Sequence, residues 1–168
     1  MTKSDSKKRR VLGLDPGTAV TGYGIIDCEG QILVAVDYGC IRVPCSMPIF
    51  DRYLAIFENL SELIVTYAPD EVAIETQFVK KNPQSALKVG MARGVAIVAA
   101  RKKEILIFEY SPSVAKRAVT GNGSASKQQV QGMVQRLLKL PKLPTPYDAA
   151  DALALAICHS HQTKKIIL

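Results

Sequence analysis

The stretch that decides the fold is residues 11–18, Val11-Leu12-Gly13-Leu14-Asp15-Pro16-Gly17-Thr18. A short apolar run bounded by turn residues is typical of a buried strand, and this one ends on an acidic side chain. Open α/β sheets place their ligand sites at the carboxyl ends of strands, where Asp15 would lie. An aspartate there can equally support the turn by accepting hydrogen bonds from backbone N–H groups. On this stretch alone the structural role is the better interpretation, but three later acids reverse it.

Composition and charge indicate one folded domain with a basic start. The chain has 168 residues, 48% hydrophobic and 22% charged, which is ordinary for a globular protein with its own core. Residues 1–10 hold five basic side chains and one acidic one, so they supply +4 of the net charge of +7. We therefore predict a basic flexible tail over residues 1–9 and a single domain over residues 10–168. The rest of the charge permits a nucleic-acid partner without requiring one.

The sequence argues against a membrane-spanning protein and against a secreted protein held together by disulfides. No apolar run reaches the roughly 18 residues that a membrane span requires. The basic residues before Val11 could mimic a signal peptide, but Asp15 and Pro16 end its apolar segment too early. The four cysteines, which show no C-x-x-C spacing, are expected to be small buried hydrophobes in a cytoplasmic protein. They are Cys28, Cys40, Cys45 and Cys158.

The first half of the chain predicts strands around one helix. Segments 21–26 and 31–43 are rich in Ile, Val and Tyr and are joined by a tight-turn candidate, so they extend residues 11–14 into three antiparallel strands. The apolar spacing over residues 49–67 predicts an amphipathic helix. A further strand follows at residues 71–74. A helix between strands implies a crossover and parallel pairing, which would bring Asp15 and Glu75 to one sheet edge.

The second half predicts a fifth strand and four more helices. Asn82 and Pro83 suit a helix N-cap and first residue, and Ser126 with Gln129 reads as a capping box. The predicted helices run from residue 83 to about 102, from Ser111-Pro112 onward, after Ser126, and from 147 to about 159, with the strand at 104–110. The fold class is therefore α/β, a five-stranded mixed sheet, three strands antiparallel and then two parallel, flanked by helices.

Two acids on the last helix change the interpretation of Asp15. Asp148 and Asp151 are one turn apart and share a face. Asp148 suits the helix dipole, but Asp151 lies among alanines and leucines, where a carboxylate is costly unless it is compensated. Mg²⁺ is the natural compensation, because it prefers carboxylate oxygens and leaves room for phosphates. His159 and His161 are expected to be exposed helix-end residues rather than ligands.

The ordered motifs resemble those of the RNase H-like nuclease superfamily, and more closely those of the RuvC family of bacterial Holliday junction resolvases. The matching segments are Gly13-Leu14-Asp15-Pro16-Gly17-Thr18, then Ala73-Ile74-Glu75 with Phe78, then Asp148-Ala149-Ala150-Asp151-Ala152-Leu153-Ala154. Each motif alone is weak, but the ordered set is specific and spans about residues 10–161. The resemblance implies an RNase H-like nuclease domain.

This resemblance implies a homodimer that binds a four-way DNA junction and nicks two opposing strands symmetrically, leaving ends that ligase can seal. It implies a role in DNA recombination and repair, with the branch-migration proteins RuvA and RuvB as partners. By motif match, Asp15, Glu75, Asp148 and Asp151 form the catalytic and Mg²⁺-binding set. A pair of ions per active site is implied, and Mn²⁺ can substitute. The division of roles between Asp148 and Asp151 stays open, because these helix positions vary within the family.

Phe78 and five basic residues are candidates for DNA contact. Phe78 matches an aromatic that family members insert near the junction centre, although a core or interface phenylalanine is the alternative. The basic candidates are Lys80, Lys81, Lys116, Arg117 and Lys127. We expect them to hold phosphates and set register, whereas each taken singly is more often a solvated surface residue. Lys116 and Lys127 are the stronger candidates because they flank the glycine-containing segment 121–124.

Three other functions compete with this interpretation. The first motif also opens the phosphate-binding strand of actin-like and sugar-kinase ATPases, but those need two large lobes and this chain has length for one. A non-catalytic junction-binding protein would not need the complete acid set. Another RNase H-like nuclease that trims RNA precursors is disfavoured by Phe78 and the helix motif.

Overall fold

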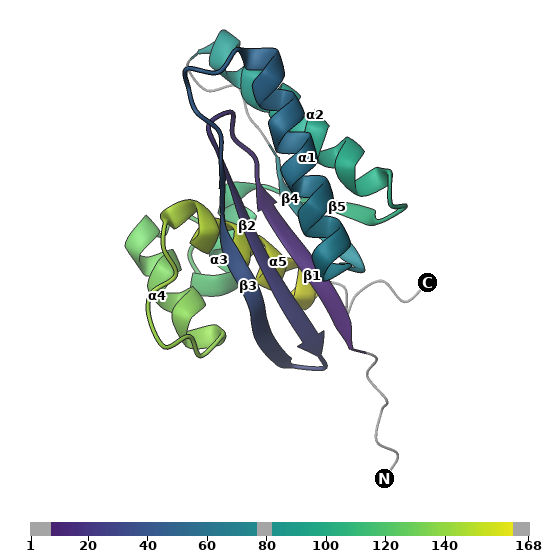
Figure 1. The fold of residues 1–168 in the computed structure, drawn as a ribbon. Helices are drawn as coiled ribbons and strands as arrows, with labels where there is room; N and C mark the ends of the chain where they lie inside the picture. Colours follow the sequence, from purple (N-terminus) through teal and green to yellow (C-terminus); the bar gives the residue numbers. More distant parts are fainter. Residues whose placement is uncertain (1–7, 77–81, 163–168) are drawn as a thin grey trace.

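The computed structural model describes residues 8–76 and 82–162, which form a sheet with helices on both faces (Figure 1). The strands of the described chain are β1 (Arg9–Asp15), β2 (Val20–Glu29), β3 (Ile32–Arg42), β4 (Glu71–Glu75) and β5 (Leu106–Tyr110). The helices are α1 (Ile49–Tyr67), α2 (Pro83–Arg101), α3 (Pro112–Thr120), α4 (Lys127–Leu137) and α5 (Tyr147–Gln162).

The sheet has the predicted mixed topology. Its strand order is β3-β2-β1-β4-β5. The β1–β2 and β2–β3 pairs are antiparallel, whereas β1–β4 and β4–β5 are parallel. Leu14 pairs with Ile74, so the next residues, Asp15 and Glu75, end neighbouring parallel strands at one edge of the sheet. The crossover through α1 therefore produces the predicted juxtaposition.

Helices α1 and α2 cover one face of the sheet, while α3, α4 and α5 cover the other (Figure 1). Each face buries its own apolar cluster, and the central strand β1 contributes to both. Val11 packs on the α5 side, whereas Leu12 and Leu14 pack on the α1 side. A strand buried on both faces needs a continuous apolar run, which explains the sequence before Asp15.

Local signals place the helices where the sequence predicted them. Helix α1 begins and ends at the predicted residues, and Ala68 ends it in the left-handed conformation with φ of 44°. The Asn82 side chain accepts hydrogen bonds from the N–H groups of Gln84 and Ser85. Ser126 and Gln129 form the predicted capping box at the start of α4. These caps satisfy N–H groups that the first helical turn leaves without partners.

Helix α5 lies very close to β1 and β2, because two strand glycines face it. A Cβ on Gly13 would lie 1.9 Å from the Ala152 carbonyl oxygen, and one on Gly22 would lie 2.1 Å from that of Asp148. Neither contact is possible for a side chain, so these positions require glycine. The close approach brings the start of α5 over the strand end that carries Asp15.

Several expectations differ from the structure. Strand β1 begins at Arg9, one residue before the expected start of the domain at residue 10, while residues 1–7 lie outside the described part. Strand β5 begins at Leu106, two residues later than expected, because the chain first turns through Glu104 with φ of 59°. Among the cysteines, Cys28 and Cys158 are buried as expected, but Cys45 is exposed and Cys40 half-buried.

His159 was expected to be exposed, and this prediction is wrong. Its side chain is fully buried on the face of α5 that packs against β4 and β5. Its Nδ1 lies 2.7 Å from the Tyr110 hydroxyl, and its Nε2 lies 2.8 Å from a Glu71 carboxylate oxygen. Burial lowers the pKa of His159, while the hydrogen bond with Glu71 opposes that shift. Side chains on β4 and β5 therefore supply the hydrogen bonds that a buried histidine on α5 requires.

No helix in the described part of the chain is long and apolar enough to cross a membrane.

Candidate active site

Asp15 and Glu75 are the last residues of two neighbouring parallel strands. The turn after Asp15 is fixed by Thr21, whose hydroxyl donates to the Gly17 carbonyl at 3.1 Å and accepts from the Gly17 N–H at 3.4 Å. Thr21 is 1% exposed, so its two hydrogen bonds with the Gly17 backbone are largely shielded from water. The first motif therefore builds a rigid strand end with the Asp15 carboxylate beyond it.

Helix α5 adds two more acids to this edge. Asp148 lies in its first turn and Asp151 follows one turn later. Gly22 pairs with Asp15 in the sheet and lies directly beneath the Asp148 backbone. The absence of a side chain at Gly22 is therefore what sets Asp148 beside the end of β1.

Three of the four acids line one small pocket of about 130 Å³. Asp15 and Glu75 contribute from the sheet, and Asp151 contributes from α5. The remaining lining residues are Lys116 and the apolar Pro112, Ala115, Val130 and Ala154. Asp148 is outside this lining, but its charge acts on Asp15. The structure thus brings together all four predicted acids, three of them in the pocket lining and Asp148 near enough for its charge to act on Asp15.

Burial and crowding of negative charge make Asp15 a weak acid in the metal-free protein. Desolvation, followed by the charges of Glu75, Asp151 and Asp148, raises the pKa of Asp15 to about 8, and Lys127 opposes the shift. Burial also raises the pKa of Asp151, although Lys127 and Lys116 lower it. Like charges that share a partly buried site disfavour ionisation, and a bound cation would remove that penalty.

Two of the predicted basic residues lie close enough to act on these acids. Lys116 is half-buried and lines the pocket, whereas Lys127 is exposed at the first position of α4. The Lys127 ammonium lies 5.7 Å from the centre of the Tyr147 ring at the start of α5. Arg117 is also exposed and lies beside Gly123 in the turn before α4. Phe78, Lys80 and Lys81 lie outside the described residues.

The donor set fits a hard divalent cation. All four candidate ligands are carboxylates, and oxygen ligands of this kind suit Mg²⁺ and Mn²⁺. Among the residues that the structure describes, no three His, Cys, Asp or Glu side chains are already arranged to hold a metal ion. Because Mg²⁺ keeps several of its waters, it needs only a few carboxylates from the protein. The raised pKa of Asp15 indicates that Lys116 and Lys127 do not fully offset burial and negative charge at this edge, which a bound cation would do.

Two neighbours of the acids were not predicted from the sequence. Arg93 of α2 donates a hydrogen bond from Nε to the Glu75 backbone carbonyl at 3.2 Å. Cys40 of β3 lies near Asp148, whose charge, after burial, raises the pKa of the thiol. Neither residue belongs to a local motif, and both reach the site only through strand order and helix packing. No sequence signal could have placed them there.

Comparisons with known proteins identify the family of this chain. The family model described as "Crossover junction endodeoxyribonuclease RuvC" matches residues 11–159. The RuvC of Protochlamydia amoebophila (strain UWE25) is 60% identical over 150 residues, 89% of each chain. The RuvC of Chlamydia pneumoniae is 51% identical over 154 residues, which cover 90% of this chain and 92% of that one.

Solved structures show the same fold. A structure of Thermus thermophilus RuvC in complex with Holliday junction substrate has a TM-score of 0.87 at 30% identity, covering 93% of this chain and 95% of that one. The yeast mitochondrial Holliday junction resolvase shares the fold at a TM-score of 0.66 and 15% identity, covering 94% of this chain and 81% of that one. With its motifs in order along almost the whole match, the chain belongs to the RuvC family of crossover junction endodeoxyribonucleases.

Proposed function

We propose that this chain is a metal-dependent endodeoxyribonuclease that resolves four-way DNA junctions by paired, symmetric nicks in recombination and repair. The observation that carries this proposal is the meeting of Asp15, Glu75, Asp148 and Asp151 at one edge of the sheet. Family membership supports the same activity and substrate. The substrate and the branch-migration partners RuvA and RuvB that the resemblance implies would place its action in the cytoplasm.

The four acids are the proposed metal-binding and catalytic residues. They would hold Mg²⁺, or Mn²⁺ in its place, and the bound ions would activate water and stabilise the leaving oxygen of the phosphodiester. Asp15 would hold the cation together with Glu75 and Asp151, with which it lines one pocket, and its pKa responds to the charges of all three other acids. Its pKa of about 8 in the metal-free protein makes binding of the cation compete with binding of a proton.

The basic residues have a separate proposed role in holding the DNA. Lys116 lines the acid pocket and Lys127 opens the neighbouring helix, so both can reach phosphates next to the bond that is cut. Arg117, Lys80 and Lys81 would extend this phosphate contact, and Phe78 would stack on bases near the junction centre. Phosphate contacts set the register of the strand without reading its sequence.

Paired nicks require two active sites, and α1 and α2 offer the surface for a second copy. An apolar groove of about 440 Å³ runs between them, lined by Tyr53, Leu54, Phe57, Met91, Gly94, Val95 and Val98. Leu54 and Val98 are each 56% exposed in the single chain, and a Cβ on Gly94 would touch nothing within 4 Å. Apolar side chains exposed together in this way are typical of a subunit interface. A two-fold dimer through this groove would present one acid site to each of two opposing strands.

Substitution of Asp15 by Asn separates binding from chemistry. Asparagine keeps the shape of the side chain but removes the ligand charge, so metal-dependent cleavage of a synthetic four-way junction should fall by about 10²-fold or more. Junction affinity, measured in EDTA by gel shift, should persist because the basic residues are untouched. Unchanged cleavage would remove Asp15 from the mechanism. Binding without cleavage by the wild-type protein, with Mg²⁺ or Mn²⁺, would instead indicate a non-catalytic junction-binding protein.

A further inference from the structure

The guanidinium of Arg93 joins α2 to the edge of the sheet that carries the acids. Its Nε donates to the backbone carbonyl of Glu75 at 3.2 Å. Its Nη2 donates to a carboxylate oxygen of Glu109, with which it also forms an ion pair. Glu109 precedes the last residue of β5, so one side chain holds the carboxyl ends of two adjacent parallel strands.

The base of this side chain is rigid. Arg93 follows Ala92, which is 0% exposed, and one turn later Ala96 is 1% exposed, so α2 is packed firmly against the sheet at this point. The Arg93 side chain is itself 21% exposed. A planar guanidinium can make both bonds at once, which a single ammonium group at this position could not do with the same geometry.

Fixing the Glu75 carbonyl also fixes the direction of the Glu75 side chain. Ile74, on one side of Glu75, is held in the sheet by pairing with Leu14 and Glu109. On the other side, Thr76 donates its N–H to the Tyr110 carbonyl at 2.9 Å. The bond from Arg93 restrains the remaining carbonyl of Glu75 itself. With the peptide groups on both sides held, the Cα–Cβ bond of Glu75 has one orientation, toward the pocket that it lines.

We propose that Arg93 is a positioning residue that orients the Glu75 carboxylate for the divalent cation. This inference rests on the proposed function, since it deepens the role given to Glu75. Removal of a group that hydrogen-bonds to a metal-ligand residue, without touching the metal, commonly lowers metal affinity or activity. Arg93 acts through the backbone carbonyl of the ligand residue, so its removal should loosen the site while leaving the fold intact. The Glu109 carboxylate is 51% exposed, and ion pairs this open contribute little to global stability.

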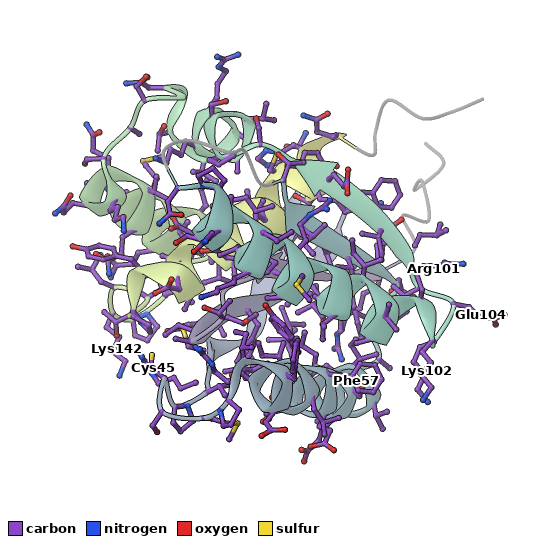
Figure 2. All side chains as sticks on the ribbon, turned by 90° about the horizontal axis from the view of Figure 1, so that it is seen from above. Cys45, Phe57, Arg101, Lys102, Glu104 and Lys142 are labelled. Atoms are coloured by element: carbon purple, nitrogen blue, oxygen red, sulfur yellow. The ribbon has the colours of Figure 1, made fainter. Side chains whose placement is uncertain are left out.

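Arg93→Gln tests the proposal, with Arg101→Gln as the matched control. Arg101 belongs to the same helix and also donates to a backbone carbonyl, that of Ile105 at 3.0 Å, but it lies at the far end of α2 (Figure 2). The first readout needs no DNA and no activity. It is the Mn²⁺ concentration that gives half of the maximal rise in melting temperature. We expect Arg93→Gln to raise this concentration about tenfold, and Arg101→Gln to leave it unchanged.

The second readout is junction cleavage as a function of Mg²⁺ concentration. Arg93→Gln should move the Mg²⁺ midpoint upward by about the same factor, with junction affinity in EDTA unchanged within about twofold. Arg93→Lys keeps the positive charge but lacks the planar fork, so it should fall between wild type and Arg93→Gln. Glu109→Gln leaves the bond to the Glu75 carbonyl in place and should have the smallest effect of the three.

The outcomes separate this inference from the proposed function. Wild-type metal midpoints for both Arg93 variants would overturn the positioning role, whatever their melting temperatures. A lower metal-free melting temperature with an unchanged metal midpoint would show a merely structural role and would also overturn it. A wild-type protein that binds Mn²⁺ but never cuts the junction would contradict the proposed function. The metal titration would still decide the role of Arg93.

Discussion

At the scale of the residue, Asp15 is the acid of the site whose pKa is shifted most clearly by its surroundings. Its carboxylate is half-buried near three other acids, and these surroundings raise its pKa from an ordinary 3.8 to about 8. A carboxyl whose pKa rises on folding binds its proton more tightly in the folded chain than in the unfolded one. Its contribution to stability is fully present below pH 3.8 and is lost as the pH rises to about 8.

Asp15→Asn should therefore stabilise the metal-free protein, and more so at high pH. Asparagine does not titrate, so the variant should gain little at pH 4 and roughly 2–5 kcal/mol over wild type at pH 8. Urea unfolding in EDTA across this range measures the difference, with Glu58→Gln on the exposed side of α1 as a control for loss of charge alone. Saturating Mg²⁺ should raise the free energy of unfolding of the wild type at pH 8 but not that of the variant. A difference that does not depend on pH would contradict the assigned cause.

Single residues also mark the limit of what the sequence could predict at the site. Asp15 and Glu75 could be paired in advance, because a crossover helix between two strands forces parallel neighbours with aligned ends. Arg93 and Cys40 could not be placed, because their nearness to the acids depends on how separate elements pack. The buried state of His159 was missed for the same reason, since Glu71 and Tyr110 come from different strands.

At the scale of the element, the contact of α5 with the sheet determines where Asp148 and Asp151 lie. Gly22→Ala would place a Cβ 2.1 Å from the Asp148 carbonyl oxygen, and backbone on both sides leaves nothing flexible to yield. We expect a loss of about 1–3 kcal/mol in the free energy of unfolding. Junction cleavage should fall by about 10²-fold, because misplacing a reacting group by 1 Å has effects of that size. Urea unfolding and cleavage rates measure the two effects.

The matched control for this prediction is Gly132→Ala on α4. A Cβ there would meet nothing within 4 Å, and alanine is the better helix former by about 1 kcal/mol. This variant should be at least as stable as wild type and equally active. Full activity of Gly22→Ala would show that the close contact of α5 is not what positions the acids.

The elements themselves were predictable from the sequence to within a few residues. Helix α1 has both its apolar spacing and its flanking prolines in the local sequence, and α4 has its capping box. The start of strand β5 was predicted less well. Residues 104 and 105 are neither glycine nor proline, so the sequence gives no sign of the turn at Glu104. Spacing and caps are local properties, whereas the depth at which α5 contacts the sheet depends on Gly13 and Gly22 together.

At the scale of the whole molecule, the proposed activity requires two copies of the chain. Val98→Glu puts a charge into the apolar groove between α1 and α2, at a position 56% exposed in the single chain. The fold should therefore tolerate the change, while association should weaken. Light scattering should show monomers at concentrations where the wild type is a dimer, and cleavage should leave single nicks.

Ile32→Glu is the control for an added charge on an exposed apolar residue. Ile32 is 66% exposed on β3, away from the groove. This variant should keep both the dimer and the paired cuts. A Val98→Glu protein that remains a dimer would place the subunit interface on another surface.

The most direct test of the central claim is cleavage of a four-way junction built into a supercoiled cruciform plasmid. Two nicks made within the lifetime of one complex convert the circle to a linear product, whereas independent nicks first accumulate as relaxed circles. With Mg²⁺, the wild-type protein should yield linear product without a relaxed intermediate, and its ends should be sealable by ligase. Binding without any cutting in Mg²⁺ or Mn²⁺, or cuts at unrelated positions on the two strands, would contradict a paired resolvase.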